Sequence, residues 1–337
     1  MAWYHFPGNR QDTVVSTRVR LARNLAGYPF PSRMEPAKAR ELITRVGDIL
    51  EENGFTKIDF ADISRATAQS LMEKLYVSPS FVRESHPHAL FLNEPCNLSV
   101  TVGEEDHTRI QCILPGLSLR DAFSGVCKME SILDGVLGFA FDKQLGYLTA
   151  SPSNLGTAMR VSVLLCLPML TAGRRMEALS LQVGQTGLLL RGVQGDEPRV
   201  IGGLCRLSNR VTLGVSEEEI LERMETAVEQ LVAAEEQLRQ RITGEEAALL
   251  TDRVRRAEGI LRYAHRLTVT ELLGYLSDLR LGVAMGLTDT RVEALTGLLV
   301  DAMPATLTLG AEASPKQEQE RDILRARVVK ERLFGAS

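Results

Sequence analysis

Residues 98–112, Leu-Ser-Val-Thr-Val-Gly-Glu-Glu-Asp-His-Thr-Arg-Ile-Gln-Cys, decide how the centre of this chain folds. Apolar and polar residues alternate on both sides of a short polar loop at 103–107. A period of two on each side of a loop predicts a β-hairpin with one buried face. The loop carries three consecutive carboxylates, Glu104, Glu105 and Asp106. Because such neighbours repel one another, we interpret the loop either as a solvated acidic turn or as a group that faces cations.

The composition is that of an ordinary globular protein, with 44% hydrophobic and 24% charged residues. A length of 337 residues accommodates one large domain and a smaller one. The net charge of −4 argues against a general nucleic-acid-binding protein. The N-terminus lacks the apolar stretch of a secretory signal, and the longest apolar run, Val161–Leu170, is interrupted by Ser162 and Pro168. Five cysteines without metal-ligand spacing are typical of reduced thiols. We therefore expect a cytoplasmic protein without a membrane span or a metal site built from its own side chains.

Hydrophobic periodicity predicts an α+β fold, in which a mainly antiparallel sheet flanked by helices precedes an all-helical region. The change comes at Ser216, which opens a helix with capping-box spacing. We place a catalytic domain at 12–243 and a helical C-terminal domain at 244–337. Besides the hairpin, strands are predicted at 12–23, 146–150, 161–167, 188–192 and 200–208. Helices are predicted at 36–53, 64–75, 118–137, 216–242, 245–267, 269–285, 290–301 and 321–333.

Five arginines lie on predicted strands or at their edges, each next to a polar loop. Burying an unpaired guanidinium group costs several kcal/mol, so these positions are poorly suited to a core. If their strands are neighbours, the side chains converge on one sheet face and form a site for a polyanion, because guanidinium forks match phosphate oxygens. For any single arginine the alternative is a surface ion pair. The chain has neither a Walker loop nor a protein-kinase Gly-rich loop. The five are Arg18, Arg20, Arg109, Arg160 and Arg191.

Four separated motifs resemble the signature blocks of the phosphagen kinases, the ATP:guanidino phosphotransferases, and they occur in that family's order. They are Ser-Thr-Arg-Val-Arg at 16–20, Glu-Glu-Asp-His-Thr-Arg at 104–109, Pro-Ser-Asn-Leu-Gly-Thr at 152–157 and Arg-Gly-Val-Gln-Gly at 191–195. Two further features are similar to the bacterial protein-arginine kinase branch. Only fifteen residues precede Ser16, where kinases of free creatine or arginine carry a helical domain. Arg-Asp-Ile-Leu-Arg-Ala at 321–326 resembles that branch's phosphoarginine-binding motif.

The resemblance implies a phosphagen-kinase-like catalytic domain that binds ATP with Mg²⁺ and phosphorylates arginine side chains of proteins. It assigns three residues to the target guanidinium, namely Glu105, Asp196 and Ser151. It assigns ATP contacts to Ser16, Thr17, Arg18, Val19, Arg20, Arg109, Arg160, Val161, Ser162, Val163, Leu164, Arg191, Gly192, Val193, Gln194, Gly195 and Asp196. It assigns phosphoarginine binding to Arg321, Asp322, Arg325 and Ala326.

The role implied for Glu105 is chemically sensible. Arginine has a pKa above about 12, so its nitrogen is a poor nucleophile unless a carboxylate aligns and deprotonates it. Three positions depart from the family pattern. Ser151 replaces the usual cysteine, whose thiolate would polarise the guanidinium, and Asp196 is one methylene shorter than the family's glutamate. Leu75 stands where we expect the branch's nucleotide-contacting histidine. These departures bear on turnover rather than on fold or ATP binding.

Two other functions stay open at the level of sequence. One is a kinase of a small free guanidine, which the short N-terminal segment disfavours. The other is a phosphoarginine-binding adaptor whose kinase centre has decayed at Ser151 and Asp196. As partners, the resemblance implies protein substrates bearing arginine, an activator protein, and a Clp-type unfoldase or protease in a stress response. We expect no direct nucleic-acid or membrane partner, and the helical tail leaves a homodimer open.

Overall fold

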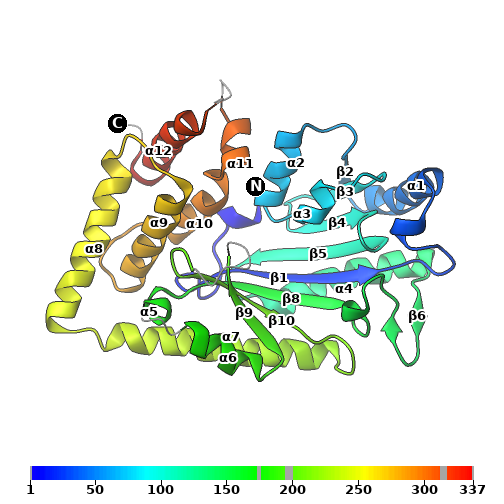
Figure 1. Ribbon diagram of the computed structural model, residues 1–337, viewed down its shortest axis with the longest axis horizontal. Helices are drawn as coiled ribbons and strands as arrows, with labels where there is room; N and C mark the ends of the chain where they lie inside the picture. The colour runs from blue at the N-terminus through cyan, green and yellow to red at the C-terminus, as the bar shows by residue number, and fades with distance from the viewer. Residues whose placement is uncertain (1, 173–175, 194–199, 312–316, 336–337) are drawn as a thin grey trace.

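The computed structural model describes residues 2–172, 176–193, 200–311 and 317–335 (Figure 1). In this described part, eight strands form one sheet in the order β2-β3-β4-β5-β1-β8-β10-β9. Every neighbouring pair is antiparallel, which confirms the predicted α+β class. The strands are β1 Val14–Arg23, β2 Phe55–Asp59, β3 Ala89–Asn93, β4 Leu98–Val102, β5 Thr108–Pro115, β8 Met159–Cys166, β9 Leu188–Gly192 and β10 Leu204–Asn209. A separate small hairpin pairs β6 Phe141–Asp142 with β7 Gly146–Tyr147.

The hairpin predicted at 98–112 is β4–β5, in the middle of the sheet order. Leu98 pairs with Cys112 at one end and Val102 with Thr108 at the other. Gly103 begins the acidic loop with φ of +86°, and a Cβ there would lie 2.7 Å from the carbonyl oxygen of Pro87. Only glycine adopts that conformation so close to backbone without strain. The loop therefore leaves the sheet at a fixed angle.

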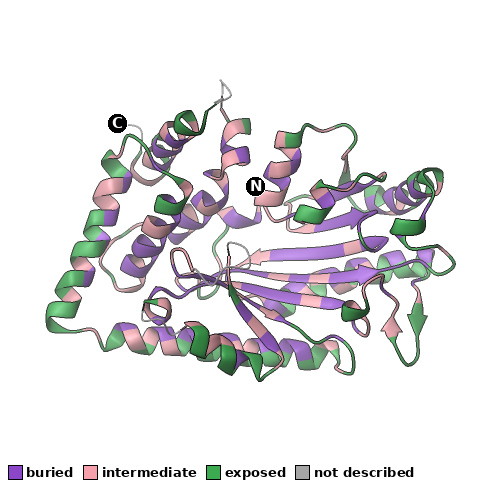
Figure 2. Cartoon of the chain, in the orientation of Figure 1, coloured by how far each residue is buried: buried purple, intermediate pink, exposed green. Residues whose placement is uncertain are grey.

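Side-chain alternation gives the sheet two unlike faces. Valines and leucines such as Val19, Val161 and Val163 are fully buried on one face. That face packs in one apolar cluster with α1, α4 and α7, and Figure 2 shows these strands as the most continuously buried part of the chain. Burying each such side chain contributes about 1.5–3 kcal/mol. The neighbouring residues along β1 and β8 necessarily project from the other face.

The helices of the sheet-containing region are α1 Pro36–Glu52, α2 Arg65–Glu73, α3 Pro79–Val82, α4 Leu119–Leu137, α5 Pro168–Thr171, α6 Met176–Gly184 and α7 Glu217–Gln240. The helical region that follows contains α8 Gly244–Tyr263, α9 Val269–Ala284, α10 Val292–Asp301, α11 Pro304–Leu309 and α12 Glu318–Phe334. Its residues form an apolar cluster of their own. The boundary placed at residue 243 falls in the turn between α7 and α8. No helix in the described ranges combines the length and apolarity needed to cross a membrane.

A buried arginine ties the helical region to the start of the sheet. Arg280 of α9 is 2% exposed and donates hydrogen bonds to the backbone carbonyl of Gln11 and, at 2.6 Å, to the hydroxyl of Thr296. Gln11 in turn donates to Glu293 of α10 at 2.8 Å. Because β1 begins three residues after Gln11, the helical region is anchored beside the strand that carries Arg18 and Arg20.

Several element boundaries differ from the predicted ones. The strand predicted at 200–208 begins only at Leu204, because Gly202 and Gly203 form a turn with φ of +59° and +63°. The strand predicted at 146–150 is limited to the two residues of β7. The final helix begins at Glu318 rather than at residue 321, with Gln317 as its cap. Strands β2 and β3 and helices α3, α5, α6 and α11 were not predicted, because short or uninterrupted apolar runs carry little periodicity.

Candidate active site

Strand register brings most of the predicted arginines to one face of the sheet. Arg20 lies directly opposite Arg160, and Arg18 lies opposite Ser162. On the far side of β10, Arg191 lies opposite Arg206. Directly opposed residues share a face, so these side chains point away from the apolar cluster. They surround a cavity of about 370 Å³ whose lining is Arg18, Arg20, Arg160, Ser162, Leu189, Arg191, Gly192, Val193, Arg206 and Ser208.

Two arginines of the cavity lining, Arg18 and Arg20, carry charge that no described carboxylate neutralises. In the described residues neither Arg18 nor Arg20 forms an ion pair, and the buried Nε of Arg20 has no hydrogen-bond partner. Burial, together with repulsion from Arg206 and Arg109, lowers the pKa of Arg18 to about 9. Burial and four neighbouring arginines lower the pKa of Arg20 well below its ordinary value. A ligand with several anionic oxygens would relieve both burial and repulsion, so the face is built for a polyanion.

Hydrogen bonds to neutral acceptors orient two of these side chains without cancelling their charge. The Nε of Arg18 donates to the hydroxyl of Ser162 at 3.3 Å. The Nη1 of Arg160 donates to the backbone carbonyl of Asn209 at 2.7 Å. Both acceptors are neutral, so each guanidinium group keeps donors for a ligand.

Arg109 forms an ion pair with a carboxylate of the acidic loop. It lies on β5, outside the cavity lining, and its Nη1 is 2.5 Å from a carboxylate oxygen of Glu104. The other oxygen of Glu104 accepts from Ser78 and, at 2.7 Å, from Ser80. Burial opposes the charge of Glu104, but Arg109 and the two serines outweigh it and lower the pKa of this carboxyl. Glu104 therefore anchors Arg109 and the loop rather than facing a substrate.

Glu105, the predicted catalytic base, has a different environment. Its side chain reaches solvent at the tip of the loop. Partial burial, and then the negative charge of Asp106, raise its pKa. Arg109 acts in the opposite direction, and Glu104 adds a smaller increase. A carboxylate with a raised pKa is a stronger base than an ordinary glutamate. It also gains most from an incoming cation, such as a guanidinium group.

The next residue, Asp106, connects this loop to the loop that holds Ser151. Asp106 is 2% exposed, and its Oδ1 accepts hydrogen bonds from Asn24 Nδ2 at 2.7 Å and from the backbone N–H of Ala150 at 2.8 Å. Its Oδ2 is buried and has no hydrogen-bond partner among the described residues. The hydroxyl of Ser151 lies 2.9 Å from that of Ser153. Glu105 and Ser151 are the chain neighbours of Asp106 and Ala150, so the Ala150–Asp106 hydrogen bond holds them near each other although they are 46 positions apart in the chain.

Several other residues predicted to bind ATP do not line the arginine cavity with their side chains. The side chains of Val19, Val161 and Val163 lie in the apolar cluster on the opposite face. Thr17 is buried, donating to the carbonyl of Gly116 at 2.7 Å, and Ser16 is also buried. Leu164 lines an apolar cavity beside the arginine face. Three predicted residues, Gln194, Gly195 and Asp196, lie outside the described residues.

Two residues of this site, Arg206 and Asp106, were not predicted from the sequence. Arg206 lies on β10 and lines the cavity, and its alternation with Ser208 within a predicted strand was the signal that could have found it. Asp106 was quoted as part of the acidic loop, but nothing local indicates that it reaches Ala150. That contact depends on how two distant loops meet.

In the helical region, the predicted phosphoarginine motif is partly internal. Arg325 is 1% exposed, donating to the backbone carbonyls of Ala302 at 2.9 Å and Leu267 at 2.7 Å, and its Nη1 is 2.5 Å from Asp322. Ala326 is also buried, whereas Arg321 is half-buried. Arg325 and Asp322 thus hold α12 against the ends of α9 and α10.

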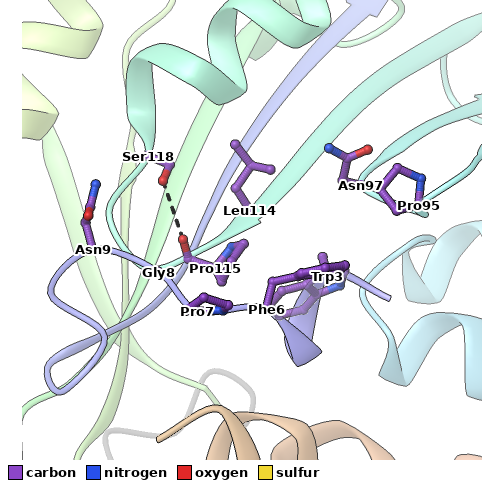
Figure 3. Close-up of a pocket in the computed structure, with 10 residues that line it drawn as sticks. All are labelled: Trp3, Phe6, Pro7, Gly8, Asn9, Pro95, Asn97, Leu114, Pro115 and Ser118. Atoms are coloured by element: carbon purple, nitrogen blue, oxygen red, sulfur yellow. Dashed lines mark hydrogen bonds between the residues drawn. The ribbon is translucent and has the colours of Figure 1, made fainter. Parts of the chain in front are cut away.

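A further pocket of about 540 Å³ lies at the end of β5 remote from Glu105 (Figure 3). Trp3, Phe6, Leu114 and Pro115 contribute to its lining, and Ser118 donates to the carbonyl of Pro115 at 3.5 Å across one side. No lining residue is titratable, so this pocket offers neither a base nor a phosphate ligand. The chemistry is concentrated at the arginine face.

Two protein families match consecutive parts of the chain. Residues 39–238 match the ATP:guanido phosphotransferase C-terminal catalytic domain. This range of the chain contains every strand of the large sheet except β1. Residues 247–337 match the protein-arginine kinase McsB C-terminal domain. With the antiparallel sheet and its arginine face, these matches define the class: the chain belongs to the ATP:guanido phosphotransferase family.

Full-length relatives define the branch. The chain is 36% identical over 345 residues to the protein-arginine kinase of Desulforamulus reducens, covering 99% of this chain and 96% of that protein. It is 39% identical over 343 residues to the protein-arginine kinase of Symbiobacterium thermophilum, covering 98% and 96%. These similarities lie in the protein-arginine kinase branch of the family, as the motifs indicated.

Solved structures agree on the fold. Lombricine kinase is 21% identical with a TM-score of 0.62, over 71% of this chain and 70% of that one. The duplicated taurocyamine kinase from Schistosoma mansoni, with bound transition state analog components, is 25% identical with a TM-score of 0.58. That match covers 68% of this chain and 33% of the other.

Proposed function

We propose that this chain transfers the γ-phosphoryl group of MgATP to arginine side chains of proteins. The observation that carries the proposal is the solvent-accessible carboxylate of Glu105 together with a sheet face of converging guanidinium groups, of which Arg18 and Arg20 form no ion pair with any described residue. The first element suits a cationic acceptor presented from a protein surface, and the second suits a nucleotide polyphosphate. The names of the full-length relatives support a protein rather than a free guanidine as acceptor.

The chemistry follows from these positions. Glu105 takes a proton from the target guanidinium, and the freed nitrogen attacks the γ-phosphorus as the bond to the bridging oxygen of ADP breaks. The arginine face holds the phosphates in line and stabilises charge on the transferring group. Ser151 accepts or donates a hydrogen bond at the acceptor but carries no charge at neutral pH. Asp196 completes the acceptor site in this proposal.

The proposal includes Mg²⁺ as the ion that accompanies the bound ATP. Among the described residues no three metal-ligating side chains come together, so phosphate oxygens and water would hold the ion. When bound, Mg²⁺ neutralises charge on the β- and γ-phosphates.

We extend the proposal to the fate of the product. Phosphoarginine on a protein is recognised at the 321–326 motif, where Arg321 is the accessible cation and the buried Asp322, Arg325 and Ala326 hold the helix in place, and it marks that protein for Clp-type proteolysis in a cytoplasmic stress response. An activator protein and a homodimer belong to the same proposal. The half-buried Arg321 supports this assignment, because it can reach a phosphate while Arg325 stays internal.

The test is phosphoryl transfer from radiolabelled ATP to casein, followed by mass spectrometry for phosphoarginine. We expect acid-labile label on arginine, no label with Glu105→Gln, and little inhibition by millimolar free arginine. Transfer to free arginine in preference to casein would overturn the protein-acceptor assignment. Nucleotide binding without any transfer would instead support a phosphoarginine-binding adaptor.

A further inference from the structure

Arg206 differs from the other arginines of the face in its surroundings. It lies on β10, opposite Leu164 on one side and Arg191 on the other. It lines the arginine cavity of about 370 Å³, and it also lines an adjoining cavity of about 200 Å³. Val193 is the other residue common to both cavities. Arg206 therefore marks the place where the two cavities meet.

The wall of the adjoining cavity is mainly apolar. Apart from Arg206, the few polar side chains in it already form hydrogen bonds within the protein. Leu75, Leu164, Ile201 and Leu273 contribute to its wall. Glu73, also in the wall, accepts from the backbone N–H groups of Ala305 and Thr306. The cavity thus contains an apolar surface suited to a flat ring rather than to phosphate.

The remaining polar side chains of this wall are satisfied in the same way. Trp3 donates to the carbonyl of Lys74 at 3.2 Å, and Thr296 accepts from Arg280 at 2.6 Å. Arg206, in contrast, has neither a hydrogen bond nor an ion pair to any described residue. Burial lowers the pKa of Arg206. Among the neighbouring charges that lower the pKa of Arg18, that of Arg206 has the largest effect. Within the described residues, this guanidinium group therefore has no partner.

We propose that Arg206 binds the α-phosphate of the nucleotide, at the junction between a nucleoside in the apolar cavity and the β- and γ-phosphates on the arginine face. The inference rests on the proposed use of ATP by this site. A nucleotide is elongated, with the α-phosphate joining an apolar ring and sugar to the charged end. The residue at the junction of an apolar and a cationic cavity faces that group. Because the α-phosphate takes no part in phosphoryl transfer, Arg206 acts in binding and not in the chemical step.

The experiment measures equilibrium binding of ATP, ADP and AMP by calorimetry to the wild-type chain and to Arg206→Gln, with steady-state kinetics alongside. We expect the dissociation constants of all three nucleotides to rise by a similar factor, about ten-fold for one lost charge-assisted contact. The kcat should stay within about three-fold while the KM for ATP rises. Arg206→Lys should lie between the two, because lysine keeps the charge but lacks the fork.

Arg210→Gln is the matched control, since Arg210 is exposed directly after the same strand and lines neither cavity. Without nucleotide, Arg206→Gln should unfold at an equal or higher temperature than wild type, because it removes repulsion from the arginine face. Unchanged binding in Arg206→Gln would overturn the inference, as would a loss confined to ATP or a loss of kcat without a loss of binding. A wild-type chain that binds no nucleotide would refute the proposed function as well.

Discussion

The Oδ1 atom of Asp106 accepts a hydrogen bond from the backbone N–H of Ala150 at 2.8 Å. This bond joins the loop of β4–β5 to the loop after β7. Glu105 precedes Asp106 and Ser151 follows Ala150, so two groups assigned to the acceptor guanidinium lie next to the same contact. Asn24, which donates to the same oxygen at 2.7 Å, adds the end of β1 to the arrangement.

We expect Asp106→Ala to lower kcat by about 10–100-fold, because a displacement of about 1 Å at a reacting group can cost 10²-fold. The dissociation constant for ATP should stay within about two-fold. Asp106→Asn keeps an oxygen that can accept from Ala150, so it should retain more activity than the alanine variant. Equal activities of the two variants would show that the carboxylate charge matters and the tether does not.

Glu105→Gln should reduce phosphoryl transfer by roughly 10²–10⁴-fold, the usual contribution of one positioned acid–base group. ATP affinity, measured by calorimetry on the same preparation, should stay within a few-fold, because the arginine face holds the nucleotide. A parallel loss of nucleotide binding would contradict the assignment of Glu105 to the acceptor.

The same residue predicts a pH dependence. Burial and the charges of Asp106 and Glu104 raise the pKa of Glu105 in the free enzyme. A general base acts only when deprotonated, so kcat/KM should fall as the pH falls through this raised pKa. The acid limb should therefore lie above about pH 4.3, the ordinary value for glutamate. The residual rate of Glu105→Gln should lack this limb, and persistence of the limb would assign it to another group.

Ser151→Cys should raise the rate, because a thiolate is a stronger partner for a guanidinium cation than a neutral hydroxyl. The gain should be at most about ten-fold, since Glu105 and the arginines provide most of the positioning. It should grow toward alkaline pH, where more of a cysteine with an ordinary pKa of about 8.5 is ionised. A pH–rate profile of both proteins on one peptide tests this. A cysteine variant that is slower throughout would mean that the site is adapted to serine.

In the helical region, Arg325→Ala should lower the free energy of unfolding by about 3 kcal/mol, because it removes the buried partner of Asp322 and leaves that carboxylate only the more exposed Arg266, at 3.8 Å. The carbonyls of Ala302 and Leu267 lose their donor in the same variant. Arg321→Ala should leave stability within about 0.5 kcal/mol and weaken binding of a phosphoarginine peptide. Urea unfolding and fluorescence titration separate the two effects. A stable Arg325→Ala chain that fails to bind phosphoarginine would make Arg325 a ligand-binding residue.

The local sequence determined the secondary structure wherever a pattern repeats over several residues. The alternation at 98–112 produced β4–β5, and the two-residue spacing of Arg18 and Arg20 placed both on one face. Capping residues such as Ser216 marked helix starts, because a side-chain oxygen there satisfies a free backbone N–H. These outcomes depend on interactions between residues close in the chain, so they can be predicted without the fold.

Only the tertiary structure decided which strands are neighbours and which side chains lack partners. Arg191 and Arg206 face each other because β9 pairs with β10, and the meeting of two cavities at Arg206 depends on helices far along the chain. The bond from Ala150 to Asp106 likewise depends on the docking of two distant loops. Such relationships arise from contacts between segments far apart in sequence, whose energies no local pattern records.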